Sequence, residues 1–301
     1  MVTGGNRGIG FEICRQLAQK GIKVILAARN QQKGEVAAEK LQKEGLDVVY
    51  HRLDVTDEES IKKTAEYVNQ NFGKLDILIN NAGIMIDREI RGLEADMDKV
   101  KGSVEVNTCG PSRVCKAFIP IMQKNNYGRI VNMSSHMAAL HQMVGLAPGY
   151  RISKTALNAV TRILADELSQ TNITINSVSP GWVRTEMGGS EAPDSIEEGA
   201  DTAVWLATSD NVATGKFFAK RQELGWWVWK EKLYFEDMVK VRNYFNKDVG
   251  EVVGLGYPLN AKVSSDADAT LGEQKAHIGL VALFSEMGRI YPHLKKWTEM
   301  D

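Results

Sequence analysis

The sequence lacks the features that mark disulfide-rich, zinc-binding and membrane proteins. Its three cysteines, Cys14, Cys109 and Cys115, form no CxxC pair, so neither a disulfide framework nor a thiolate zinc site is expected. No apolar run approaches the roughly 20 residues that span a bilayer. The chain starts directly with a glycine-rich turn, which is unlike a signal peptide. We therefore expect a cytoplasmic protein without a membrane segment, in a compartment that keeps thiols reduced.

An excess of one charge is also missing. Lys and Arg total 37 against 38 Asp and Glu, which gives a formal net charge of -1. This balance argues against the broad basic surface that nucleic-acid binding requires. The five histidines show no HExxH or comparable spacing, so no metal site is predicted.

Short runs of β-branched and aliphatic residues alternate with helical patterns over the first 180 residues. The predicted strands are 23–27, 48–53, 75–80, 129–132 and 173–178. The predicted helices are 11–20, 35–44, 60–72, 97–123 and 153–170. The strand runs are nearly continuous in apolar residues, which is typical of strands covered on both faces. The repeated strand–helix–strand order predicts an α/β fold with a doubly wound parallel sheet.

The alternation stops near Trp226. Residues 227–301 contain an aromatic cluster, a polar stretch and one amphipathic helix. We expect a single α/β domain over residues 1–226 and a C-terminal extension over residues 227–301. The extension is expected to pack against the domain or against a neighbouring subunit, and its role is not predicted.

A glycine-rich turn, TGGNRGIG, occupies residues 3–10 and precedes a predicted helix. Such a turn lets backbone N–H groups approach a pyrophosphate, and the start of a helix carries partial positive charge. No Lys-Ser/Thr pair follows the last glycine, so the motif is not a triphosphate-binding P-loop. Glycines serve tight turns equally well, but the position of this turn at the head of a βαβ pattern favours a dinucleotide site.

The second predicted strand ends without a carboxylate. NAD enzymes of this architecture place an acid there for the ribose 2′-hydroxyl, whereas this chain has Arg29. Arg29 and Arg7 are suited to pair with a 2′-phosphate, although either alone could be a solvated surface charge. The pattern favours NADP(H) as the cofactor.

A tyrosine and a lysine lie four residues apart at the start of an amphipathic helix. This spacing places Tyr150 and Lys154 on one helical face, where an ammonium would favour the phenolate. Ser134 and Ser135 close a predicted strand at the edge where ligands bind in such folds. Asn107 lies within a predicted helix, and Pro111 lacks the N–H that would bond to its carbonyl, so we expect a kink with that carbonyl free for water.

The order TGxxxGxG, NNAG, helix Asn, SS, YxxxK and PGWVRT resembles the short-chain dehydrogenase/reductase superfamily, and most of all its NADPH-dependent carbonyl reductases. The resemblance covers residues 1–226 and implies a Rossmann-type fold. It also implies reduction of an aldehyde or ketone by hydride transfer, with Tyr150 as general acid/base. The catalytic residues that it implies are Asn107, Ser135, Tyr150 and Lys154.

The resemblance further implies which residues bind the cofactor. Gly4, Gly8 and Gly10 match the pyrophosphate turn, Asp54 the adenine contact, and Val183 and Thr185 the contacts to the nicotinamide carboxamide. The full predicted set is Gly4, Asn6, Arg7, Gly8, Ile9, Gly10, Arg29, Asp54, Val55, Asn81, Ala82, Gly83, Tyr150, Lys154, Pro180, Gly181, Val183 and Thr185.

Two features differ from the carbonyl reductases that this chain resembles. Only Met1 and Val2 precede the glycine turn, so the first strand is expected to be short. Only 15 residues separate Ser135 from Tyr150, where the monomeric members carry a long insertion, so a homodimer or homotetramer is expected. The alternative function is a dinucleotide-binding regulator or scaffold that uses residues 227–301 as an interaction surface. The substrate itself, beyond a small carbonyl or alcohol, is not predicted.

Overall fold

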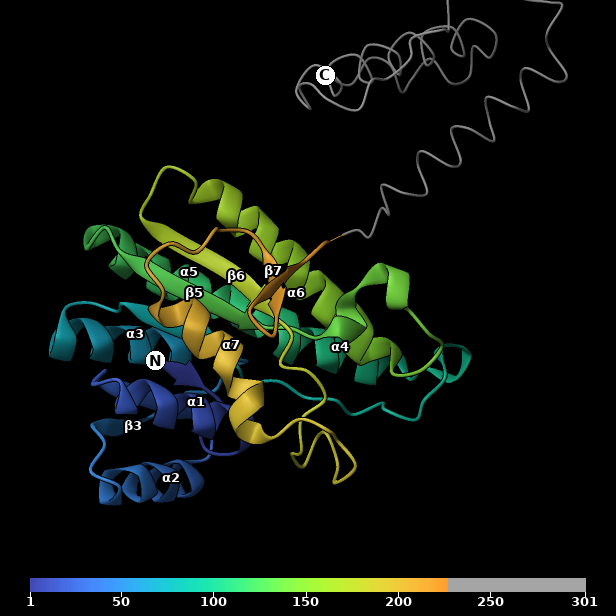
Figure 1. The fold of residues 1–301 in the computed structure, drawn as a ribbon, viewed down its shortest axis with the longest axis horizontal. Coiled ribbons are helices and arrows are strands. Elements are labelled where there is room, and N and C mark those ends of the chain that lie inside the picture. Colours follow the sequence, from blue (N-terminus) through green and yellow to red (C-terminus); the bar gives the residue numbers. More distant parts are fainter. Residues whose placement is uncertain (227–301) are drawn as a thin grey trace, which may run out of the picture. The chain divides into compact units, whose positions relative to one another are not determined.

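The computed structural model describes residues 1–226, and the predicted extension 227–301 lies outside the described residues (Figure 1). One eight-stranded sheet has the order β3-β2-β1-β4-β5-β6-β7-β8. Neighbours from β3 to β7 are parallel, and β8 is antiparallel to β7. Helices cover both faces of this sheet, which confirms the predicted doubly wound α/β architecture.

The strands are β1 (Val2–Thr3), β2 (Val24–Ala28), β3 (Val48–Arg52), β4 (Ile77–Asn80), β5 (Gly128–Met133), β6 (Ile173–Val178), β7 (Phe217–Ala219) and β8 (Gln222–Leu224). The α-helices are α1 (Gly8–Gln19), α2 (Gln31–Lys43), α3 (Glu58–Phe72), α4 (Met97–Val104), α5 (Gly110–Lys124), α6 (Pro148–Glu167) and α7 (Ile196–Thr208). Within residues 1–226, no helix is both long enough and apolar enough to cross a membrane.

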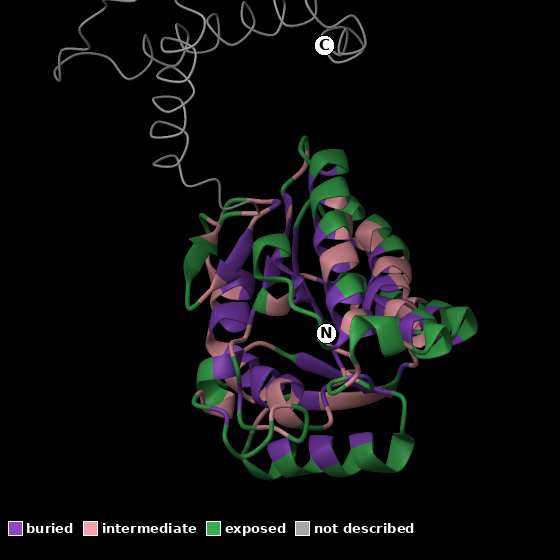
Figure 2. Cartoon of the chain, turned by 90° about the vertical axis from the view of Figure 1, so that its right-hand side faces the viewer, coloured by how far each residue is buried: buried purple, intermediate pink, exposed green. Residues whose placement is uncertain are grey.

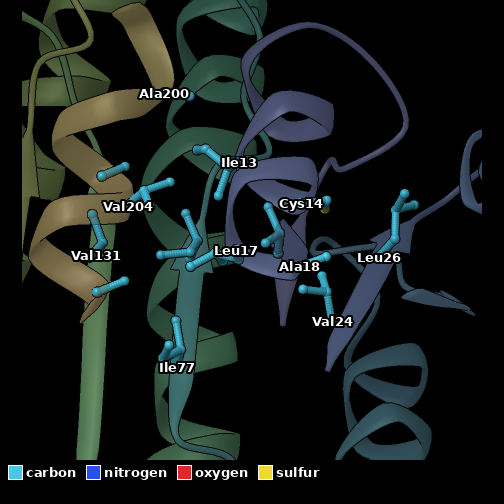
Figure 3. Close-up of a cluster of buried hydrophobic side chains, with 14 of the residues drawn as sticks. Ile13, Cys14, Leu17, Ala18, Val24, Leu26, Ile77, Val131, Ala200 and Val204 are labelled. Carbon is cyan, nitrogen blue, oxygen red and sulfur yellow. The ribbon is translucent and has the colours of Figure 1, made fainter. Parts of the chain in front are cut away.

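Two hydrophobic clusters hold the helices on the sheet. Helices α1, α2 and α7 cover one face, where side chains such as Leu17 and Val204 meet those of the strands (Figure 3). Helices α3, α5 and α6 cover the other face with residues such as Phe118 and Leu168. Figure 2 shows the consequence: the central strands and the inner helix faces are buried, and the outward helix faces are exposed.

The short first strand is confirmed. Strand β1 pairs with both β2 and β4 although it has only two residues. The chain runs from β1 outward through β2 to β3, and then returns to place β4 on the other side of β1. Strand order therefore reverses at β1 and β4, and in open α/β sheets the crevice at the carboxyl ends of such strands is where ligands bind.

The long predicted helix over 97–123 is interrupted. It divides into α4, a π-helical turn (Glu105–Cys109) and α5. In the π turn the N–H of Gly110 bonds to the carbonyl of Glu105, five residues back, and Pro111 follows directly. The irregularity expected around Asn107 is therefore present, in a form that often accompanies functional sites.

Three elements near the end of the described chain were not predicted: α7, β7 and β8. Helix α7 nevertheless begins with a readable signal. Ser195 accepts a hydrogen bond from the N–H of Glu198, and the Glu198 carboxylate accepts one from the N–H of Ser195. This reciprocal capping box fixes the start of the helix.

Candidate active site

A cavity of about 1020 Å³ lies at the carboxyl edge of the sheet. This volume suits a large ligand, because pockets for small molecules and cofactors usually enclose about 300 to 1,000 Å³. The predicted site residues that line it are Gly4, Asn6, Arg7, Gly8, Ile9, Gly10, Arg29, Asp54, Val55, Asn81, Ala82, Gly83, Tyr150, Lys154, Pro180 and Thr185. The fold thus brings together residues as far apart in the chain as Gly4 and Thr185.

Four predicted site residues do not line the cavity: Asn107, Ser135, Gly181 and Val183. Val183 is buried against α7, where a Cβ added to Gly199 would lie 2.6 Å from Val183 Cγ2. Gly181 adopts a φ of +90° and packs against Asp194. The cofactor contacts expected of Gly181 and Val183 remain predictions.

The glycine turn has the shape of a phosphate cradle. Gly4 and Gly8 have φ values of +64° and +55°, which favour glycine. A Cβ on Gly10 would lie 2.3 Å from Asn81 Nδ2, so α1 approaches the NNAG segment too closely for any side chain there. Asn81 Nδ2 itself donates to Thr3 O at 2.9 Å. Among the described residues no side chain caps the start of α1, which leaves its first N–H groups available to an anion.

Arg29, Asp54 and Arg7 are the charged predicted residues on the cofactor side of the cavity lining. Arg29 is exposed at the end of β2, and Asp54 follows β3. Burial acts to raise the pKa of Asp54, but hydrogen bonds from Thr56 and the charge of Arg29 outweigh it and hold the pKa below its usual value. Arg7 forms an ion pair with Glu186 from the loop after Pro180.

Tyr150 and Lys154 both lie in the first two turns of α6 and are almost fully buried. Burial raises the pKa of Tyr150 to about 12, and the side chain of Ser135 and the charge of Arg88 act against this rise. Burial also lowers the pKa of Lys154 to about 8. Lys154 Nζ lies 5.8 Å from the centre of the Tyr150 ring and donates to Met133 O at 2.7 Å. Both side chains are thus held in surroundings that favour their neutral forms.

The two serines after β5 occupy different positions. Ser134 lines the cavity, and its hydroxyl donates to Lys154 O at 3.4 Å. Ser135 accepts from the N–H of Met137 at 3.1 Å and acts on the Tyr150 phenol. Ser135 is therefore the member of the pair whose side chain lowers the pKa of Tyr150, and its catalytic role remains a prediction.

The Asn107 side chain connects the segment after β4 to helix α6. Its Nδ2 donates to Ile84 O at 2.8 Å and to Ser153 Oγ at 3.0 Å, and its Oδ1 accepts from Ile84 N at 2.8 Å. The Asn107 side chain therefore ties the segment after NNAG to the helix that carries Tyr150. It is fully buried, which makes these three bonds costly to lose.

Sequence reasoning missed two buried charged residues beside Tyr150. Asp87 accepts from the N–H of Gly149 at 2.5 Å, at the start of α6. Arg151 donates to the carbonyls of Leu146, Met137 and Gln142, and so fixes the loop that leads from Ser135 to Tyr150. Neither Asp87 nor Arg151 belongs to a spaced motif. Only their burial in the structure sets them apart from the other charged residues of the chain.

Comparison with known proteins identifies the family. The model of the short chain dehydrogenase family matches residues 1–195. The chain belongs to the short-chain dehydrogenase family. It is 35% identical to (+)-neomenthol dehydrogenase of Arabidopsis thaliana, over 74% of this chain and 96% of that protein. It is 31% identical to carbonyl reductase (NADPH) 1 of Bos taurus, over 75% of this chain and 97% of that protein.

Solved structures of family members agree with this assignment. NADPH-bound carbonyl reductase from chicken fatty liver superposes with a TM-score of 0.66 at 27% sequence identity, covering 75% of this chain and 97% of that one. Salutaridine reductase from Papaver somniferum gives a TM-score of 0.64 at 31% identity, covering 72% and 98%. The chain is thus an oxidoreductase of this family with a Rossmann-type fold.

Proposed function

We propose that this protein is an NADPH-dependent reductase that converts an aldehyde or ketone to an alcohol. The observation that carries the proposal is that Tyr150, Lys154 and Ser134 line the same cavity as the glycine turn and Arg29, with Ser135 acting on Tyr150. Similarity to NADPH carbonyl reductases supports the same choice of cofactor and reaction.

The residues present fit a dinucleotide phosphate. The Gly4–Gly10 turn and the uncapped start of α1 would hold the pyrophosphate, and Arg29 with Arg7 would hold the 2′-phosphate. When bound, NADPH supplies the hydride. The ion pair of Arg7 with Glu186 would have to open for Arg7 to contribute.

The protein contributes position and a proton. The Tyr150 phenol gives its proton to the carbonyl oxygen of the substrate, and Ser135 favours the resulting phenolate. Lys154 is the cation on the same face of α6, and Asn107 keeps α6 in register with the segment after NNAG. Each of these roles depends on the fixed start of α6, since small displacements of a reacting group reduce rates strongly.

Replacing Tyr150 with phenylalanine tests the mechanism. Tyr150→Phe removes only the proton donor, so NADPH oxidation over a panel of aldehydes and ketones should fall by roughly 100-fold or more. Tyr127→Phe alters a tyrosine outside the cavity lining and should retain activity. Equal turnover by Tyr150→Phe and wild type would refute the mechanism. If NADPH raises the melting temperature of wild type but no compound turns over, the regulator or scaffold function is favoured instead.

Reversing the charge at Arg29 tests the cofactor. Arg29→Asp places a carboxylate where NAD enzymes bind the ribose 2′-hydroxyl, so the ratio of kcat/KM for NADPH over NADH should fall. Lys116→Asp makes the same charge change at an exposed position outside the cavity lining and should leave the ratio unchanged. An unchanged ratio in Arg29→Asp would contradict the 2′-phosphate role.

We further propose a cytoplasmic homodimer or homotetramer. Three free cysteines suit a reducing compartment. Leu140 and Val144, in the short segment between Ser135 and Tyr150, are exposed by 46% and 59%, and Ile152 just after it by 50%. Exposed apolar residues so close together favour an interface between copies of the chain. Light scattering after size-exclusion chromatography measures the assembly, and a monomer would contradict it.

A further inference from the structure

Arg88 is a basic side chain in the cavity that the proposed function does not use. It lines the cavity and makes no hydrogen bond or ion pair within residues 1–226. The other basic residues around it have partners or an assigned role: Arg7 pairs with Glu186, and Lys154 bonds to Met133 O. Arg88 is exposed to solvent, and a guanidinium whose donors no protein group uses is suited to bind an anion that enters the cavity.

The backbone that carries Arg88 is fixed beside the start of α6. The neighbouring Asp87 is only 2% exposed and accepts from Gly149 N, one residue before Tyr150. Two backbone bonds continue the attachment, from Ala147 N to Ile90 O at 3.0 Å and from Gly92 N to Gly145 O at 2.9 Å. The backbone at Arg88 is therefore held against the segment that leads into Tyr150.

This position lies at the opposite end of the cavity from the proposed phosphate contacts. Arg29 follows β2, whereas Arg88 follows β4, and β1 lies between these strands in the sheet. The charge of Arg88 also acts on the phenol of Tyr150, where it opposes part of the rise in pKa that burial causes. An anion on Arg88 would therefore lie near the reacting carbonyl rather than on the adenosine side.

Several apolar side chains line the cavity together with Arg88. Met85 and Ile86 precede it in the chain, and Val106 and Met187 line the same cavity. A ligand beside Arg88 can therefore meet both its charge and apolar side chains. A neutral compound that covers the guanidinium would displace its water without offering a charged acceptor, which favours ligands that carry one negative charge.

We propose that Arg88 binds a carboxylate of the substrate, so that the preferred substrates are carbonyl compounds with a carboxylate near the carbonyl and an otherwise apolar body. This inference rests on the proposed reductase function and adds its substrate class. The carboxylate would accept hydrogen bonds from the guanidinium while the carbonyl oxygen meets Tyr150.

Matched pairs of oxo acids and their methyl esters test the proposal with NADPH. For each pair that the protein reduces, wild type should have a higher kcat/KM for the oxo acid than for its methyl ester. In Arg88→Met the ratio of kcat/KM for acid over ester should fall by roughly 10- to 100-fold, the effect typical of losing a hydrogen bond to a charged group, with most of the loss in KM. Arg91→Met removes a charge from the same segment outside the cavity lining and should keep the wild-type ratio.

The outcomes separate this inference from the reductase function. If both compounds turn over and the ratio of kcat/KM for acid over ester is the same in wild type and Arg88→Met, Arg88 does not bind the carboxylate. The reductase function is then unaffected. Where neither compound turns over, the reductase function fails, and calorimetric titration of the acid into the NADPH-saturated protein decides the Arg88 role. Binding that Arg88→Met abolishes and Arg91→Met retains supports it, and absence of binding to wild type refutes it.

Discussion

Replacing Lys154 with methionine is expected to stabilise the protein measured without nucleotide while it abolishes turnover. Lys154 is 4% exposed, and burial lowers its pKa from the ordinary 10.5 to about 8. Each pH unit of such a change corresponds to about 1.4 kcal/mol, so the charged lysine costs the folded state about 3 kcal/mol at pH 7. Methionine has a similar length and no charge, which suits it to this buried position.

The lost hydrogen bond to Met133 O offsets part of this gain. Leaving that carbonyl without its partner costs about 1 kcal/mol, so the net stabilisation at pH 7 is about 2 kcal/mol. For a domain of this size, that corresponds to a rise in melting temperature of about 4 to 8 °C. Turnover should nevertheless be lost, because Lys154 is the proposed cation beside Tyr150.

The pH dependence gives the sharper test. A cation whose pKa is lower in the folded state releases its proton there first, so the free energy of unfolding of wild type rises from about pH 8 to pH 10.5. Below pH 8 the penalty is fully present, and above pH 10.5 it is gone. Lys154→Met lacks this titration, so its advantage over wild type should be largest at pH 7, vanish near about pH 9.5, and become a deficit of about 1 kcal/mol by about pH 10.5.

Urea unfolding between pH 7 and pH 10.5, without nucleotide, measures the difference between the two proteins. Lys116→Met removes a lysine from the exposed face of α5 and should change stability by no more than about 0.5 kcal/mol at any pH. A Lys154→Met protein that is less stable than wild type at pH 7 would refute the reasoning, as would an advantage that does not shrink as the pH rises.

Two further changes probe how α6 and α7 are held. Gly149→Ala places a Cβ 2.9 Å from Asp87 Oδ2 and 3.0 Å from the Val100 Cα, so thermal unfolding should show a loss of about 1 to 3 kcal/mol, although helix propensity alone predicts a gain. Unchanged or higher stability would show that the Asp87 contact is not tight. Ser195→Ala removes the cap of α7 and should cost about 1 kcal/mol in urea unfolding with turnover retained. An unaffected midpoint would contradict the capping box.

The fold was predictable because its signals are local. Strands β2 to β6 were recognised within a few residues, since each is a short apolar run between helical patterns. Strands β7 and β8 have only three residues each and gave no comparable signal. Helix α7 was missed although Ser195 and Glu198 form its capping box, a pattern that is visible in the sequence.

The site was predictable to the extent that its residues belong to spaced motifs. Tyr150 and Lys154 share a helical face, and the cavity contains them as expected. Val183 belongs to an equally clear motif, yet its side chain packs against α7. Motif membership fixes the chain segment that approaches a ligand, but the direction of each side chain depends on what packs behind it.

The sequence by itself determined the family, the doubly wound sheet and the chain segments that meet at its carboxyl edge, because periodicity and motifs are patterns within short stretches of chain. Only the tertiary structure decided which charges are buried or left without partners. Asp87 and Gly149 are 62 residues apart, and their contact fixes the segment that presents Arg88. Burial and pairing are set by such long-range contacts, since the free energy of a charge depends on its surroundings in space.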